Sequence, residues 1–421
     1  MTAVSRYPGW ILLVLLTLTV RGAVAWQQFD SLRNDRDNYR RLAAGLAAGE
    51  GLVHPEHGGA TAYRPPLYPL ILASVARVGG GDLGLFLLHL VLGLSTVLMT
   101  WQLGSKLELG HGAWWAALLV AGDPLLVGMA TQPMTETLIT ALVTALLLVA
   151  CQAPFGRRGL TLGLLFGLAV LCRPSLWLLG GLAGVAWVLR RRRSGSDTPV
   201  ILDRVTLVTV SLGLAVTVGP WLVRNLVVGG TPVLTTTHGG FTLLLGNNPV
   251  FYRQVVRRDW GTVWNEKTSD PGETPAQWRR NLEHRLPVAW DGIASERQRD
   301  SWMYRRAWSH ISNDPGGFLH ACLLRGVRFW SPLSLEFGLS PLLKWGTAAW
   351  YTLLTLAMLG GLLRRPQRQV PAWQGSLLLL ISLTAVHLVF WSTLRMRAPL
   401  VPVIALLAVV GVINPSGRSD G

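Results

Sequence analysis

Carboxylates that could take part in group transfer occur in two short stretches of this chain. Asp35 and Asp37 lie just before Tyr39 in a polar stretch, and Glu136 begins an apolar run. A carboxylate beside a membrane helix can act as a general base, bind a cation or hold an arginine. It can also cap the helix, since a helix N-terminus favours negative charge. For Asp35 and Asp37 taken alone, a cap or solvated loop acid is the simpler interpretation. For Glu136, a helix cap and a chemical role are equally supported.

Arginines near the ends of apolar runs provide candidate anion-binding groups. A guanidinium group can bind a phosphate through two parallel hydrogen bonds. Arg395 and Arg397 precede the last apolar run on a side where topology rules expect few arginines, which favours an anionic ligand such as a lipid phosphate. Arg173 has a structural alternative, an ion pair with Glu136 or with the intramembrane Asp123.

A second candidate for anion binding is the turn from Gly246 to Pro249, which contains Asn247 and Asn248. Adjacent glycines follow His238 a few residues earlier. Such sequences form tight turns whose backbone N–H groups can face an anion, with a plain loop as the alternative.

The sequence gives only weak evidence for metal binding or redox chemistry. His54 and His57, with Glu56 between them, have a spacing that could contact a metal, but a solvated loop is favoured. The three cysteines show neither metal-type spacing nor a disulfide framework and are interpreted as small buried side chains.

Composition indicates what must position these residues. Half of the 421 residues are hydrophobic, only 14% are charged, and the mean hydropathy is +0.38. Long apolar runs alternate with short charged stretches, which is typical of repeated membrane crossings. The net charge of +16 comes almost entirely from arginine, in clusters beside apolar segments and in one long polar loop. No basic stripe has interleaved aromatics, so nucleic-acid binding is rejected.

The sequence predicts an all-α polytopic membrane protein with about ten transmembrane helices. The expected spans are residues 9–26, 83–104, 113–131, 134–152, 159–174, 176–189, 205–223, 344–363, 373–391 and 398–413. The first is expected to be a retained helix and not a cleaved signal peptide. Residues 159–189 are interpreted as a helical hairpin broken at Arg173-Pro174, with a single bent crossing as the alternative.

The distribution of basic residues predicts the orientation. With the N-terminus in the cytoplasm, the short basic clusters between spans all fall on the cytoplasmic side. Two large segments, residues 27–81 and 224–343, are then outside. The second is expected to contain a helix over 295–313 and an amphipathic surface segment over 318–330. These boundaries give an N-terminal transmembrane module with its outer loop (1–223), a small α/irregular extracytoplasmic domain (224–343) and C-terminal helices (344–421).

Several short motifs of the chain resemble those of a known family. They are Asp35-x-x-x-Tyr39, Thr61-Ala-x-Arg64-Pro-Pro-Leu-Tyr-Pro69, Thr135-Glu136, Cys172-Arg173-Pro174, Pro220-Trp221-x-x-Arg224-Asn225, Thr237 to Gly240, Gly246-Asn-Asn-Pro249 and Arg397-x-Pro399-x-x-Pro402. In this order the chain resembles GT-C superfamily membrane glycosyltransferases, specifically the protein O-mannosyltransferase and aminoarabinose-transferase-like group, which uses polyprenyl-phosphate sugars.

The resemblance implies an enzyme of the cell or inner membrane that moves a sugar to a lipid, glycan or protein acceptor on the extracytoplasmic face. Inverting transfer by direct displacement is the expected mechanism. It implies that an acid of the first outer loop is catalytic, Asp35 by match and Asp37 as the alternative. Outer arginines would hold the donor phosphate, with Arg64, Arg224 and Arg397 as matches. The further substrate-binding candidates are Tyr39, Glu136, Arg173, Asn247, Asn248 and Arg395.

No cofactor is required with certainty. A divalent cation held by Asp35 is an alternative to the base role if the acceptor is itself a phosphate. Two other classes of protein remain as alternatives. A transporter or flippase of lipid-linked saccharides would need a polar midplane pathway, for which few charges are present. A non-catalytic scaffold of cell-envelope assembly is the third hypothesis.

Overall fold

The computed structural model describes residues 9–151, 158–193, 204–267, 269–333, 340–364 and 371–413. The structure is 75% helical, and no β-strand occurs in the described ranges beyond one isolated bridge between Val53 and Ala60. The predicted all-α polytopic membrane fold is therefore confirmed.

Every expected span coincides with a helical segment. These segments are α1 (Gly9–Gln27), α4 (Gly81–Lys106), α5 and α6 (Gly112–Ala121 and Pro124–Met129), α7 (Glu136–Ala150), α8 (Gly159–Cys172), α9 (Trp177–Arg193), α10 (Arg204–Gly229), α16 (Pro341–Leu363), α17 (Pro371–Val389) and α18 (Val401–Val412). In the described part of the chain, six stretches are long and apolar enough to cross a membrane alone, namely α1, α4, residues 205–229 of α10, α16, residues 372–389 of α17 and residues 394–412. The others are shorter.

Two of the shorter helices end where the sequence requires it. The Asp123 side chain accepts a 3.0 Å hydrogen bond from the Leu126 amide and caps α6, whose first residue is Pro124. This cap separates α5 from α6. Similarly, Arg173 has an extended backbone (φ −148°) because it precedes Pro174, so α8 ends there and α9 begins after a 3₁₀ turn over Pro174–Leu176.

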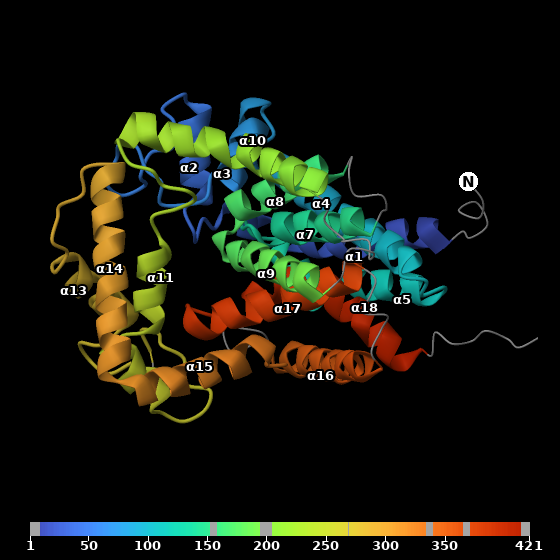
Figure 1. The fold of residues 1–421 in the computed structure, drawn as a ribbon. Helices are drawn as coiled ribbons and strands as arrows, with labels where there is room; N and C mark the ends of the chain where they lie inside the picture. Colours follow the sequence, from blue (N-terminus) through green and yellow to red (C-terminus); the bar gives the residue numbers. More distant parts are fainter. Residues whose placement is uncertain are drawn as a thin grey trace, which may run out of the picture.

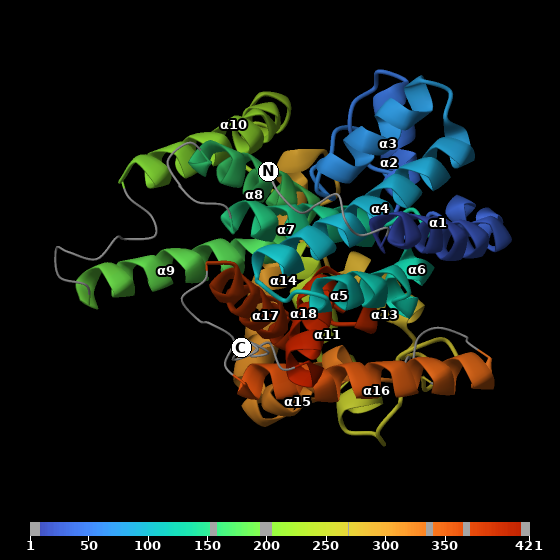
Figure 2. The ribbon, with the colours of Figure 1, turned by 90° about the vertical axis from the view of Figure 1, so that its right-hand side faces the viewer.

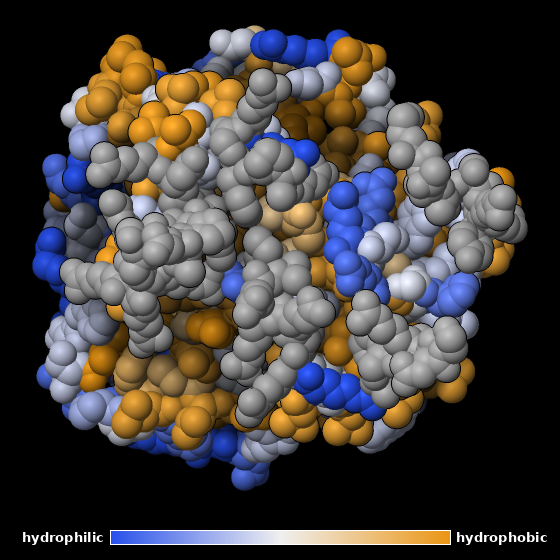
Figure 3. Space-filling view, turned by 45° about the vertical axis from the view of Figure 1, so that its right-hand side comes forward, coloured by the Kyte–Doolittle hydropathy of each residue, from blue (hydrophilic) through white to orange (hydrophobic). Residues whose placement is uncertain are grey.

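Close helix packing joins the bundle. A Cβ added at Gly163 of α8 would lie 2.1 Å from the carbonyl oxygen of Val210 in α10, so only glycine permits this approach. In Figure 2, α10 and α16 lie on opposite flanks of the group formed by α4, α5, α7, α17 and α18. Hydrophobic side chains cover much of the surface in Figure 3, as lipid contact requires; Leu15, Val216 and Leu353 are among the exposed ones.

The two large polar segments meet at one end of the bundle. The first contributes a 3₁₀ turn (Phe29–Arg33), α2 (Tyr39–Ala47) and α3 (Leu67–Arg77). The second contributes α11 (Gly239–Gly246), α12 (Pro249–Phe251), α13 (Pro275–Glu283), α14 (Ile293–Asn313) and α15 (Pro315–Trp330). The last two match the helices expected over 295–313 and 318–330. In Figure 1, α11, α13 and α14 stand at the left, with α2 and α3 above them.

Candidate active site

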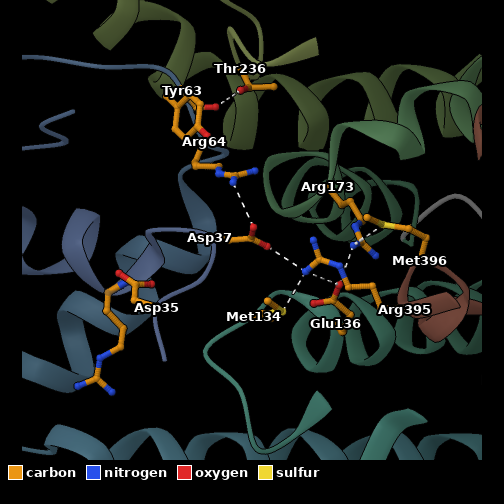
Figure 4. Close-up of polar contacts among 11 residues, drawn as sticks. Asp35, Asp37, Tyr63, Arg64, Met134, Glu136, Arg173, Thr236, Arg395 and Met396 are labelled. Atoms are coloured by element: carbon orange, nitrogen blue, oxygen red, sulfur yellow. Dashed lines mark hydrogen bonds and ion pairs between the residues drawn. The ribbon is translucent and has the colours of Figure 1, made fainter. Parts of the chain in front are cut away.

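Asp37 lies in the turn before α2, between two arginines from distant parts of the chain. One carboxylate oxygen, Oδ2, lies 2.9 Å from Nη1 of Arg395, and Oδ1 lies 3.3 Å from Nη2 of Arg64. All three side chains retain only 16–17% exposure. Figure 4 shows Asp37 pointing into the space between the two guanidinium groups. The ion pairs bring together the first large polar segment and the short 3₁₀ segment Leu394–Leu400 (η5) that precedes α18.

Glu136 extends this cluster on its other side. Its Oε1 lies 2.9 Å from Nη2 of Arg173 and 3.6 Å from Nη1 of Arg395. Glu136 is the first residue of α7 and is 1% exposed, whereas Arg173 caps the C-terminus of α8. The sequence hypothesis that Arg173 pairs with Glu136 therefore describes a contact that is present. Met134 and Met396 place their sulfur atoms against Arg395 and Arg173 respectively (Figure 4).

The cluster has more donor capacity than its carboxylates use. It holds the three arginines Arg64, Arg173 and Arg395 against the two carboxylates of Asp37 and Glu136. Nε of Arg64 and Nη1 of Arg173 are buried and have no hydrogen-bond partner among the described residues. Buried donors in native proteins almost always find a partner. This site therefore has the charge and the free donors to receive an anion.

Electrostatics keep Asp37 ionised. Burial alone would raise the pKa of its carboxyl, but the charges of Arg395 and Arg64 outweigh it and lower the pKa to about 2. The Arg64 guanidinium also stacks on two aromatic rings, 4.8 Å from the centroid of Tyr63 and 5.6 Å from that of Tyr39. Burial raises the pKa of Tyr39, so its phenol stays protonated. Tyr39 therefore forms a neutral wall beside the cluster.

Asp35 has a different environment. Its two carboxylate oxygens accept hydrogen bonds from the backbone amides of Arg40 and Arg41, at 3.0 and 2.9 Å. These are amides of the first turn of α2, so the side chain satisfies donors that the helix leaves free. In Figure 4 Asp35 lies apart from the Asp37 cluster. Asp35 is thus placed to fix the start of α2, and through it the turn that carries Asp37.

Arg224, in the last turns of α10, holds the first large polar segment. Its Nη1 donates to the carbonyl of Thr61 at 2.8 Å, and its Nη2 to that of Leu52 at 3.3 Å. The guanidinium lies 5.2 Å from the ring centroid of Trp221. Arg224 therefore positions the stretch that leads to Arg64 and does not contact the Asp37 cluster.

Asn247 and Asn248 are buried at the end of α11. The Asn247 amide donates to the carbonyls of Leu243 and Val389, and its oxygen accepts from Tyr252 and Arg325. Asn248 caps α12 by accepting from the Phe251 amide. Both asparagines are at most 2% exposed, so their described contacts are internal.

Arg397 is buried inside the bundle, against the ring of Tyr351. It is 1% exposed, lies 4.5 Å from the ring centroid of Tyr351, and donates long hydrogen bonds to the carbonyls of Phe329 and Ser331. Its Nε and Nη2 have no partner among the described residues. Arg395 and Arg397, two residues apart, thus face different surroundings.

Sequence reasoning missed Glu296 and Arg325. Glu296 in α14 accepts hydrogen bonds from the hydroxyls of Thr61 and Thr237 and from the Ala62 amide, and so ties α14 to the loop before Arg64. Arg325 in α15 donates to the carbonyls of Gly246 and Leu388 at 2.6 Å. No local pattern distinguishes either residue from the many other charged residues of this segment.

Comparison with known families gives a match for part of the chain. Residues 63–222 match the family model described as dolichyl-phosphate-mannose-protein mannosyltransferase. These residues carry a GT-C superfamily domain. The match supports a membrane glycosyltransferase of the mannosyltransferase type. Comparison with curated proteins and with solved structures found no match.

The GT-C domain covers less than half of the chain but contains three of the five clustered residues. Arg64, Glu136 and Arg173 lie inside the matched range, and Asp37 and Arg395 lie before and after it. The remainder of the chain therefore completes the charged cluster of this domain.

Proposed function

We propose that the chain transfers a sugar from a polyprenyl-phosphate donor to an acceptor hydroxyl at the extracytoplasmic face of the cell membrane. The observation that carries this proposal is the Asp37 carboxylate held between Arg64 and Arg395. This arrangement places a carboxylate beside a site that can bind a phosphate, next to a domain of a glycosyltransferase family that uses a lipid-phosphate sugar.

The charge of the cluster suits the leaving group. A sugar phosphodiester carries one negative charge, and the lipid phosphate that leaves carries two once the sugar–oxygen bond breaks. Three arginines against two carboxylates leave one positive charge in surplus. The unused N–H groups of Arg64 and Arg173 are available to the phosphate oxygens as this charge develops. Donors fixed where charge develops stabilise the transition state more than the ground state.

The base role of Asp37 follows from competition for its arginines. With a pKa of about 2 the carboxylate is a weak base while both guanidinium groups hold it. A bound phosphate takes over part of their charge, and the pKa of Asp37 then rises. The carboxylate can accept the proton of the acceptor hydroxyl as the acceptor oxygen attacks the anomeric carbon. The bond from that carbon to the phosphate oxygen breaks on the opposite face, so the product is inverted.

The distribution of arginine supports the extracytoplasmic side. The two large polar segments that build the site lie at one end of the bundle (Figure 1). The short basic clusters of the sequence fall in the alternate connections between spans, which the positive-inside rule assigns to the cytoplasm. An outer site also meets the donor lipid after it has been flipped across the membrane.

A pair of matched variants tests the proposal. Membranes containing Asp37→Asn or Asp35→Asn are assayed for transfer from a polyprenyl-phosphate sugar, with insertion checked by protease protection. The expected result for Asp37→Asn is a loss of about 10²-fold or more, as for removal of a general base. Asp35→Asn keeps shape and part of the cap, and a loss of less than about tenfold is expected because a cap contributes about 1 kcal/mol. Full activity in Asp37→Asn contradicts the assignment.

A further inference from the structure

A cleft lined by aromatic rings adjoins the proposed active site. It lies between the first outer loop and the helices α13 and α14 of the second polar segment. The rings that line it are those of His54, His57, Tyr63, His238, Phe241 and Trp290. Tyr63 also carries the stacked Arg64 guanidinium, and Asn38, which lines the cleft, follows Asp37 directly in the chain. The cleft and the Asp37 cluster are therefore neighbours.

The rings form one connected cluster. His57 stacks on His54 with centroids 4.6 Å apart, and on Trp290 at 5.4 Å. His238 stands edge-on to Tyr63 at 4.5 Å and stacks on Phe241 at 5.0 Å. His54, 5.4 Å from Tyr63, joins the two sets. Aromatic contacts of this kind fix the orientation of each ring. The cleft thus offers rigid, flat surfaces.

Two imidazoles of this cleft, those of His54 and His238, act as neutral groups at physiological pH. Burial lowers the pKa of His238 well below its usual value, and burial likewise lowers that of His54. A neutral imidazole offers one hydrogen-bond donor and one acceptor beside its flat face. These rings therefore favour an uncharged polar ligand over an anionic one.

Polar groups at the rim add to this preference. Glu56 and Arg279 line the cleft with exposed side chains, and Arg279 also lies 5.5 Å from the ring centroid of Phe241. Glu283 pairs with Arg299 at the cleft edge. Carboxylates, guanidinium groups and imidazoles beside aromatic faces match the two kinds of surface on a pyranose, its apolar C–H faces and its ring of hydroxyls.

We propose that this cleft binds the acceptor and that the acceptor is a saccharide, either a glycan or the sugar headgroup of a lipid. The proposal rests on the proposed function, because the cleft gains its role from the transfer reaction beside it. A terminal sugar lying on Trp290 and His57 directs one hydroxyl past Asn38 and Tyr63 towards Asp37. The backbone on the loop side of the cleft is already paired within the protein, as in the bond from the Thr237 amide to the Ala62 carbonyl and the Val53–Ala60 bridge. An extended peptide acceptor therefore finds few main-chain partners there.

Direct binding tests this proposal independently of transfer. The full-length protein in nanodiscs is titrated with a panel of methyl glycosides and short oligosaccharides, and with a Ser/Thr-containing peptide, by saturation-transfer difference NMR. The expected result is that at least one saccharide binds and that His57→Ala and Trp290→Ala each weaken it by about tenfold or more, as for truncation of an aromatic anchor. His57 is exposed, so its variant keeps the fold even if loss of Trp290 does not. Trp308→Ala, with a side chain 54% exposed elsewhere on α14, is the matched control and should bind normally.

Three other outcomes would overturn the proposal, each for a different reason. Binding of the peptide with the same dependence on His57 makes the acceptor a protein. Saccharide binding that is unchanged in His57→Ala removes the ligand from this cleft. Saccharide binding that competes with a polyprenyl-phosphate sugar assigns the cleft to the donor. Full transfer activity in Asp37→Asn contradicts the proposed function, whereas saccharide binding that ignores His57 contradicts only the acceptor site, so a failed transferase mechanism and a failed acceptor site give different results.

Discussion

Asp37 and Arg395 form a 2.9 Å ion pair although 358 residues separate them in the chain. The pair joins the first polar loop to the segment before the last helix, and both side chains are 17% exposed. Because Arg64 holds the other oxygen of the same carboxylate, the position of Asp37 depends on both arginines.

The first prediction concerns pH. The folded protein holds the pKa of Asp37 at about 2, below its usual value of about 3.9 in an unfolded chain. A lowered folded-state pKa means that the ion pairs stabilise the protein fully above about pH 4–5 and that this contribution is lost as the pH falls towards 2. Unfolding of the detergent-solubilised protein should therefore show a steeper loss of stability below pH 4 in the wild type than in Asp37→Asn. Equal slopes would mean that Asp37 is not held by these arginines.

The second prediction separates stability from catalysis at Glu136 and Arg173. Arg173→Met leaves the 1% exposed Glu136 carboxylate without its 2.9 Å partner, and breaking a buried ion pair costs about 3–5 kcal/mol. Adding Glu136→Gln removes a buried charge that only Arg395, at 3.6 Å, still partners, so the double variant should regain much of the melting temperature. Transfer activity should remain low in the double variant, since the phosphate has lost a guanidinium group. Recovery of activity together with stability would assign the pair a purely structural role.

The third prediction concerns the contact between α14 and the loop before Arg64. Glu296 accepts hydrogen bonds from Thr61, Ala62 and Thr237, and Glu296→Ala leaves these buried donors unsatisfied at about 1–3 kcal/mol each. Hydrogen–deuterium exchange should then increase over residues 52–64, with a fall in transfer activity. Asp291→Ala, which removes an exposed acid nearby, is the control. Unchanged exchange in Glu296→Ala would show that α14 does not hold the loop.

The helix bundle was predictable from the sequence because each membrane span is marked by a local run of apolar residues. Each apolar run, and breaks such as Arg173-Pro174, gave a helical segment or helix end in the expected place. The helices over 293–313 and 315–330 were also recognisable in the sequence. A helical stripe of side chains marks the first, and Asp314-Pro315 marks the boundary between them. These features depend only on residues that are close together in the sequence, so the sequence alone predicts them.

The side-chain partners of the site were less accessible to sequence reasoning. Asp35 and Asp37 have the same residue type, two positions apart, yet one contacts the amides of α2 and the other contacts arginines from distant segments. Arg395 and Arg397 show the same divergence. Turn geometry and tertiary packing decide these orientations, and neither is encoded in residue spacing alone. The catalytic and binding roles of all these residues remain predictions.

The ion pair between Asp37 and Arg395 also has a consequence for biogenesis. During synthesis the loop carrying Asp37 is made early, whereas Arg395 leaves the ribosome only after almost every other span has been made. The charged cluster is therefore completed last, and a chain that stalls or is cut before this point holds Asp37 and Glu136 without Arg395. Under the proposed function, competence for transfer is thus tied to synthesis of nearly the whole chain.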